Sequence, residues 1–351
     1  MSSAVVITGV GSVNAAFAAG RQGLEAWLQA PRAVAGDTLV PAALGRLVDE
    51  TEARRLSRVS QLSVAAARLA LRDAGLPSGT DIGLVLGSEF GDLRSTAAFA
   101  EGYLTAGASG LSALLFPNTV MNTMASATTI AVGARALSLT LNARMVAGEL
   151  AVARAAAAIA GGRAPALLAG GVDEIEPRVA RALVELGAID QPHGEGATFL
   201  VLEARDTAQA RGAEILGEIA GVASRALRAR PHGVGRSGAS RAIGAALTEA
   251  GLSAAELGWV YASFGGDRER DCWQTRLLDE ALGGSCPARS SLRPWFGEHA
   301  GTGALSVAAA AWTARSGRLL GPEGSARPVQ PGPGIVHGLA RGGTEVALIV
   351  R

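Results

Sequence analysis

The 351-residue sequence predicts an α/β fold in which helices cover both sides of the sheets. Three observations support this prediction. Short apolar runs that end near glycine recur along the chain, helical patterns lie between them, and the runs are continuously apolar, as in strands buried on both faces. The apolar runs are residues 4–12, 81–91, 164–174, 197–204, 257–266 and 344–351.

The helical patterns divide the chain into two similar parts. "SQLSVAAARLALRDAGL" (60–76) has apolar residues at three- and four-residue spacing, and Gly75 is suited to cap its C-terminus. "GASRAIGAALTEAGL" (238–252) has the same shape, and a strand-like run follows each segment. A Pro- and Gly-rich loop is expected at 321–334, before the last strand. We therefore expect two related halves, residues 1–205 and 206–351, that together form one compact unit.

Composition limits the kinds of partner. A formal net charge of +1 gives no electrostatic reason to expect nucleic acid or an anionic membrane as the main partner. No run approaches the about 20 strongly apolar residues that a membrane span needs, and the N-terminal segment lacks the basic region of a signal peptide. Cys272 and Cys286 are too few for a disulfide framework. We expect a cytoplasmic protein in a reducing compartment.

No cofactor or metal site is predicted. "TGVGSVN" follows the first strand, but Asn14 stands where a dinucleotide fingerprint requires its third glycine. The arginine-rich segment 225–241 fits a docking patch for an acidic carrier or, more commonly, a solvated loop and helix face. The four histidines are scattered beside glycines or loops without the paired spacing of metal ligands; they are His193, His232, His299 and His337.

The segment "LSLTLNARMVAGELAVARAAAAIAGG" (137–162) predicts a strand, a small-residue corner and an Ala-rich helix. Corners of this kind often present a nucleophile. Met145 stands at this one, and a thioether has no proton to lose, so it cannot become an anionic attacker.

Five segments in order and at matching spacing resemble the β-ketoacyl synthases, condensing enzymes of the thiolase fold. The segments are "VVITGVGSVNAAFAAGRQGLEAWLQA", the run from "FPNTVMNTMA" to "LLAGGVDE", "GEGATFLVLE", "ALTEAGLSAAELGWVYAS" and "GLARGGTEVALIVR". This resemblance implies the layered α-β-α-β-α arrangement of that fold.

The resemblance also locates the family's catalytic positions, where this sequence departs from the family. The cysteine position holds Met145, the first histidine position Ser263, the second histidine position Glu298 and the lysine position Arg293. Asp271 keeps the family's downstream acidic residue. The sequence thus predicts that the catalytic set is absent.

This replacement removes the chemistry of condensation. The reaction needs a thiolate to hold the acyl chain and two neutral donors to stabilise an enolate. Ser263 could donate one hydrogen bond, but an ionised Glu298 would repel the enolate. We expect Met145 to fill the vacated pocket and Arg293 to pair with Glu298 in the same place.

The resemblance then implies a chain-length factor: an inactive subunit that forms a heterodimer with a competent ketosynthase and shapes its acyl tunnel. An acyl carrier protein would be reached through that complex. Strand 138–143 would lie at the dimer interface, and segment 113–125 would reach toward the partner. The candidate tunnel residues are Phe90, Leu115, Phe116, Val120 and Met124, each of which ordinary core packing could also explain.

Two sequence departures qualify this interpretation. Met145 differs from the glutamine that many aromatic-type chain-length factors carry at this position, which favours another branch such as a reducing, polyene-forming system. The segment between "GGVDE" and "GEGATF" is short and holds no Gly-Phe-Gly gating loop, as befits a subunit without an acyl-enzyme.

Three alternatives stay open. Cys272 and His299 could form a relocated nucleophile and base with Glu298 as orienter, although a buried, inert Cys272 is the better expectation. A malonyl-carrier decarboxylating, priming subunit could work through Ser263. A homodimeric scaffold or acyl-binding protein would need no ketosynthase partner.

Overall fold

The computed structural model describes residues 3–32, 44–185, 193–236, 238–283, 285 and 287–351. Its strands are β1 (Val5–Val13), β2 (Ala18–Gly20), β3 (Gly83–Ser88), β4 (Ser138–Asn142), β5 (Ala166–Asp173), β6 (Gly196–Ala204), β7 (Gly217–Ala226), β8 (Trp259–Ala262), β9 (Ala288–Ser290), β10 (Arg318–Leu320), β11 (Ala326–Pro328), β12 (Gly334–Leu339) and β13 (Thr344–Val350). Its helices are α1 (Arg21–Gln29), α3 (Glu50–Ala53), α4 (Arg58–Asp73), α5 (Leu93–Ala106), α6 (Thr123–Val132), α7 (Ala147–Ala160), α8 (Pro177–Glu185), α9 (Arg205–Ala210), α10 (Arg241–Ala250), α11 (Arg268–Leu282), α12 (Arg293–Phe296) and α13 (Ala300–Ser316).

The strand order repeats in the two parts of the chain. The main sheet runs β4-β3-β5-β6-β1-β7-β13-β12-β8-β9. Each part of the chain contributes five strands to this order when β2 and the β10–β11 pair are left out. If the five are numbered in chain order, both parts run from the outer edge inward as third, second, fourth, fifth and first strand. The pairings repeat too, since β3 and β8 each have two parallel neighbours while β6 and β13 each have two antiparallel ones. The repeat supports two related halves joined where β1 pairs with β7, and the boundary at residue 205 stays a prediction.

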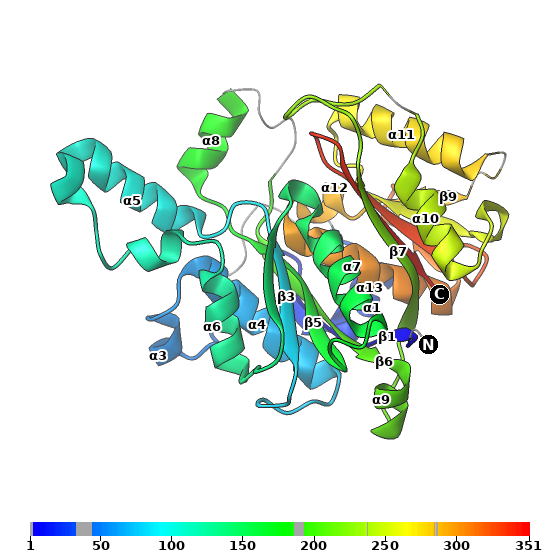
Figure 1. Ribbon diagram of the computed structural model, residues 1–351, viewed down its shortest axis with the longest axis horizontal. Helices are drawn as coiled ribbons and strands as arrows, with labels where there is room; N and C mark the ends of the chain where they lie inside the picture. The colour runs from blue at the N-terminus through cyan, green and yellow to red at the C-terminus, as the bar shows by residue number, and fades with distance from the viewer. Residues whose placement is uncertain (1–2, 33–43, 186–192, 237, 284, 286) are drawn as a thin grey trace.

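Helices form three layers around these strands. α7 and α13 lie between the two halves and contact strands of both. α4 and α6 cover the outer face of the first half, and α10 and α11 cover the second (Figure 1). The expected α-β-α-β-α arrangement is therefore confirmed.

Small residues let the central helices approach closely. A Cβ on Gly148 in α7 would collide with the carbonyl oxygen of Ala300 at the start of α13. Only glycine permits this approach. The contact brings the corner that precedes α7 against the turn that precedes α13, and the candidate site forms there.

The predicted elements are found with small shifts in their ends. The two helical patterns form α4 and α10, and Gly75 has a left-handed φ of 68° just after the first of them. One expectation is wrong in part: residues 321–334 are not all loop, because Ala326–Pro328 pairs antiparallel with Arg318–Leu320. Among the described helices, none is long and apolar enough to cross a membrane.

Candidate functional site

The site is built around the corner between β4 and α7. Residues Arg144–Val146 form a single 3-10 turn, and Arg144 adopts a left-handed φ of 51°. The Asn142 side chain holds the end of β4 to the end of β3 by donating to the carbonyl oxygens of Ser88 at 3.1 Å and Glu89 at 2.5 Å. Met145, at the centre of this turn, is buried, with 8% of its surface exposed.

The Arg270 guanidinium lies on the Met145 side chain. It comes from the first turn of α11 and is fully buried. Nη1 donates to the sulfur of Met145 and, at 2.8 Å, to Oε1 of Glu298, while Nη2 donates to the Ser263 carbonyl oxygen at 2.9 Å. Sequence reasoning missed Arg270, because "DRERD" has the composition of a solvated helix start.

The predicted ion pair between Arg293 and Glu298 is present, and both side chains are buried. Nη2 of Arg293 also donates to the Met145 carbonyl oxygen at 2.8 Å and to Oε1 of Glu149 at 3.0 Å. Glu149 lies in the first turn of α7, and the sequence analysis did not single it out. We call Glu149, Arg270, Arg293 and Glu298 the buried charge cluster.

The cluster is electrically balanced by two guanidinium and two carboxyl groups. Burial would lower the pKa of Arg293, but Glu298 and Glu149 outweigh that effect and the pKa is raised. Burial raises the pKa of Glu149, against the opposing charge of Arg293. Each ion therefore depends on its neighbours, since an unpaired buried charge is costly.

The Ser263 hydroxyl belongs to a separate network in the second half. It donates to Oε1 of Gln274 at 3.1 Å and accepts the Leu339 N–H at 3.0 Å. Gln274 in turn donates to the His337 carbonyl oxygen at 2.7 Å. Asp271 accepts the N–H of Gly266 at 2.9 Å, so it shapes the turn after β8.

Two further acidic groups lie beside the cluster. Asp173 accepts the Ser88 hydroxyl at 2.6 Å and the Ala300 N–H at 2.8 Å, yet burial raises its pKa. Burial, followed by the charges of Asp173 and Glu298, raises the pKa of Glu89 to about 8. Glu89 is therefore mostly neutral at pH 7.

The candidate tunnel residues fall in different environments. Phe116 is 58% exposed and Val120 is 46% exposed on the segment that follows α5, with Leu115 half-buried beside them. The Phe90 ring lies 5.8 Å from the His193 ring. Met124, the second residue of α6, points into the apolar core of the first half and is fully buried, which agrees with the core-packing interpretation of this residue.

The relocated nucleophile and base are not brought together. Cys272 is exposed on α11, so the expectation of a buried thiol is wrong. His299 is buried at the N-cap of α13, where burial, Arg293 and His193 lower its pKa to about 3. Cys286 lies outside the described residues.

Other predicted features have simpler outcomes. In the part of the chain that the structure describes, no group of three His, Cys, Asp or Glu side chains could hold a metal ion. The arginines between 225 and 241 are exposed. The short segment expected to lack a gating loop contains α8, and its residues 186–192 lie outside the described chain.

The fold and this site define a class of protein: a thiolase-fold relative of the condensing enzymes in which a thioether and a buried charge cluster occupy the nucleophile's corner. The family model for the β-ketoacyl synthase N-terminal domain matches residues 38–208. This part of the chain is therefore similar to the N-terminal domain of the β-ketoacyl synthases.

Known proteins similar to this chain include two from Streptomyces. The granaticin polyketide putative β-ketoacyl synthase 1 of Streptomyces violaceoruber is 28% identical over 74% of this chain and 70% of its own length. The tetracenomycin polyketide synthase ketoacyl synthase β subunit of Streptomyces glaucescens is 37% identical over 40% of this chain and 35% of its own length. The segments matched in curated relatives range from 24% to 70% of those proteins.

A solved structure, "The ishigamide ketosynthase/chain length factor", has the same fold. It superposes with a TM-score of 0.87 at 21% identity and covers 100% of this chain and 99% of the compared chain. At this identity the likeness shows the fold.

Proposed function

We propose that this chain is a chain-length factor: a non-catalytic subunit that forms a heterodimer with a competent ketosynthase and shapes the tunnel for the growing polyketide or polyene chain. The observation that carries the proposal is the contact of Arg270 with the sulfur of Met145 at the nucleophile's corner. A thioether cannot be acylated through an anionic sulfur, and the guanidinium fills the adjacent space. The corner keeps the fold of a condensing enzyme without its chemistry.

The similar proteins support the same function. One relative is a ketoacyl synthase β subunit, and one structural neighbour is a ketosynthase/chain length factor. An acyl carrier protein is the expected further partner, because it delivers the chain to such a complex. A cytoplasmic location belongs to the same proposal.

The edge of the first half offers a surface for the ketosynthase partner. β4 is the outermost strand, with β3 on one side and no described strand on the other. Nine of the ten large apolar side chains that are exposed lie between residues 103 and 139; the ten are Tyr103, Leu104, Leu111, Leu114, Phe116, Val120, Ile130, Leu137, Leu139 and Val184. An unpaired edge strand beside an apolar face favours association with another chain. Figure 1 shows α5 and the turns after it projecting from the body on this side.

The alternative activities have less support. A priming decarboxylase would need the Ser263 hydroxyl at the corner, but Gln274 and Leu339 engage it. The exposed Cys272 and the buried His299 do not form a reactive pair. A homodimeric scaffold would use the same apolar face, so copurification has to distinguish it from the heterodimer.

Copurification tests the heterodimer. The chain is co-expressed with the ketosynthase encoded next to it, with an affinity tag on the ketosynthase only. We expect a one-to-one complex that elutes as a heterodimer in size-exclusion chromatography. A stable homodimer of this chain that leaves the ketosynthase unbound would overturn the proposal and favour the scaffold.

A further inference from the structure

Three of the candidate tunnel residues, Leu115, Phe116 and Val120, lie on an arm that projects from the first half. We call residues 93–120 the arm; it comprises α5 and the turns after it (Figure 1). Phe116 is the most exposed of the three, at 58%, and begins a short 3-10 turn. A ring that limits chain length by its bulk has to stay in one place, whereas exposed side chains change rotamer within picoseconds to nanoseconds. A role in chain length therefore requires a contact that holds this ring.

The Phe99 ring of α5 provides such a contact. Its centroid lies 6.0 Å from that of the Phe116 ring, and the two ring planes meet at 49°. Aromatic rings attract each other at this separation. Among the aromatic residues that the structure describes, Phe99 is the one whose ring pairs with Phe116. Because Phe116 stays largely exposed, the contact restrains the ring and still leaves it open to an approaching acyl chain.

The backbones that carry the two rings are packed against each other. A Cβ on Gly102 would lie 2.3 Å from the carbonyl oxygen of Gly110, and a Cβ on Gly110 would lie 2.0 Å from that of Gly102. Only glycine permits this approach, so the chain folds back tightly along α5. The N–H of Phe116 donates to the Ser112 carbonyl oxygen at 3.1 Å. The start of the 3-10 turn is thereby fixed within the arm.

Helix α5 is also anchored to the body on both sides of Phe99. Before Phe99, the N–H of Arg94 donates to Oε1 of Glu174 at 2.9 Å. After Phe99, Glu101 accepts from Arg178 of α8 at 2.7 Å. Phe99 is therefore presented to Phe116 from a helix whose position on the first half is set by these contacts.

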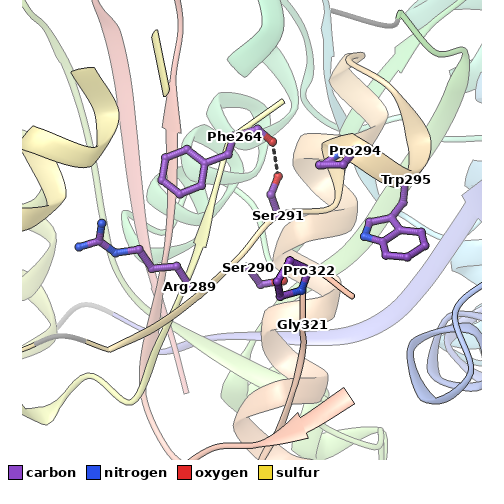
Figure 2. A pocket seen from close by; sticks show the side chains of 8 residues that line it. All are labelled: Phe264, Arg289, Ser290, Ser291, Pro294, Trp295, Gly321 and Pro322. Atoms are coloured by element: carbon purple, nitrogen blue, oxygen red, sulfur yellow. Dashed lines mark hydrogen bonds between the residues drawn. The ribbon is translucent and has the colours of Figure 1, made fainter. Parts of the chain in front are cut away.

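A cavity on the other half supplies a matched comparison. It has a volume of about 330 Å³ and lies beside β9, which ends the main sheet at the edge opposite to β4. The cavity is therefore away from the edge proposed for the ketosynthase. Phe264 is half-buried like Phe99 and lies at one end of the cavity in Figure 2. The full lining is Phe264, Arg289, Ser290, Ser291, Pro294, Trp295, Gly321 and Pro322.

We propose that Phe99 is a positioning residue for chain length: its ring fixes the Phe116 ring, and the fixed Phe116 ring stops longer chains. This inference rests on the proposed function, because it requires Phe116 to line the tunnel. Phe99 acts only through Phe116, so its removal has no further effect once the Phe116 ring is gone.

Product length measured by mass spectrometry tests this role in the reconstituted ketosynthase pair, with pairing verified by size-exclusion chromatography. Phe99→Ala should raise the share of longer chains by about two- to tenfold, the bias that one aromatic pair gives to a ring position. Phe99→Tyr keeps a ring at this position and should make the original products. The double variant Phe99→Ala, Phe116→Ala should match Phe116→Ala alone. Phe264→Ala removes an equal ring from the second half and should leave product length unchanged.

The outcomes separate this role from the proposed function. If Phe116→Ala lengthens the products and Phe99→Ala does not, the positioning role is overturned and the proposed function stands. If neither variant lengthens them, the tunnel role of Phe116 fails, and the role of Phe99 fails with it. Longer chains from the double variant than from Phe116→Ala alone, or longer chains from Phe264→Ala, would also overturn the positioning role. If circular dichroism shows that Phe99→Ala does not fold, Phe99→Leu replaces it with the same expected result.

Discussion

Arg270 donates to Oε1 of Glu298 at 2.8 Å, and Arg293 donates to the same oxygen atom. All three side chains are withdrawn from solvent. One carboxylate oxygen thus accepts from two buried guanidinium groups at the position where the resemblance puts a catalytic histidine, and Glu149 supplies the second carboxylate of the cluster.

Glu298→Gln removes one of these two carboxylates. Two buried cations would then face each other across a neutral amide, and breaking a buried ion pair typically costs about 3–5 kcal/mol. We expect the free energy of unfolding in urea to fall by that amount. Glu50→Gln breaks the exposed pair with Arg54 and should change it little. Equal effects of the two substitutions would show that the cluster does not stabilise the fold.

Met145→Cys restores the family's residue type without restoring its chemistry. Arg270 still occupies the pocket, and Ser263 and Glu298 do not replace the two histidines. Iodoacetamide should alkylate the introduced thiol at least about tenfold more slowly than the exposed Cys272 of the same molecule, because access controls the rate. Peptide mass spectrometry measures both rates. Acylation of the new thiol by an acyl thioester, with release of the carrier thiol, or loss of carbon dioxide from malonyl thioester, would show that the corner has kept its chemistry.

Stability should decline as the pH rises from about 5 to 8.5. Burial and the neighbouring Asp173 and Glu298 raise the pKa of Glu89 to about 8, and burial raises that of Glu174 to about 7. In this window the folded chain keeps protons that the unfolded chain releases, so the free energy of unfolding falls with pH. The contribution is complete below about pH 4.5, the ordinary value for these carboxyl groups.

Glu89→Gln isolates the largest part of that decline. The variant keeps a neutral side chain at every pH, so its free energy of unfolding should fall less between pH 5.5 and 8.5 than that of the unaltered chain. Glu50→Gln, at an exposed carboxylate, serves as the control and should keep the original slope. Identical slopes in all three proteins would show that Glu89 is ionised throughout.

Leu139→Lys should weaken the proposed heterodimer. Leu139 is 38% exposed on β4, the outer strand, and a charge placed in an apolar interface must be desolvated. We expect at least about a tenfold increase in the dissociation constant for the ketosynthase, measured by surface plasmon resonance. Ala226→Lys, at the exposed end of β7, should bind like the unaltered chain. An unchanged dissociation constant for Leu139→Lys would show that β4 is not part of the interface.

The fold was predictable because its signals are local. Continuous apolar runs mark the buried strands, and three- and four-residue spacing marks α4 and α10. The Pro- and Gly-rich composition around 321–334 hid the short strand β11, which is stabilised by pairing with β10. Met124 lies in the apolar core, as ordinary core packing predicts, because α6 begins at Thr123 and turns that side chain inward.

The site was predictable only in part. Arg293 and Glu298 are five residues apart and fall on matched family positions, so their pairing could be expected. The partners Arg270 and Glu149 could not, because Arg270 meets Met145 across 125 residues and Glu149 meets Arg293 across 144. Contacts at such separations depend on how the two halves pack, and no spacing rule in the sequence encodes them.

The length of the product made by the reconstituted ketosynthase shows whether this chain shapes the acyl tunnel. Malonyl-acyl carrier protein supplies the extender units, and mass spectrometry measures the product chains. The assay compares the ketosynthase alone, the pair, and the pair carrying Phe116→Ala. We expect extension by the pair, and longer chains when the exposed Phe116 ring is removed. Identical products with and without this chain, or consumption of malonyl thioester by this chain alone, would contradict the proposed function.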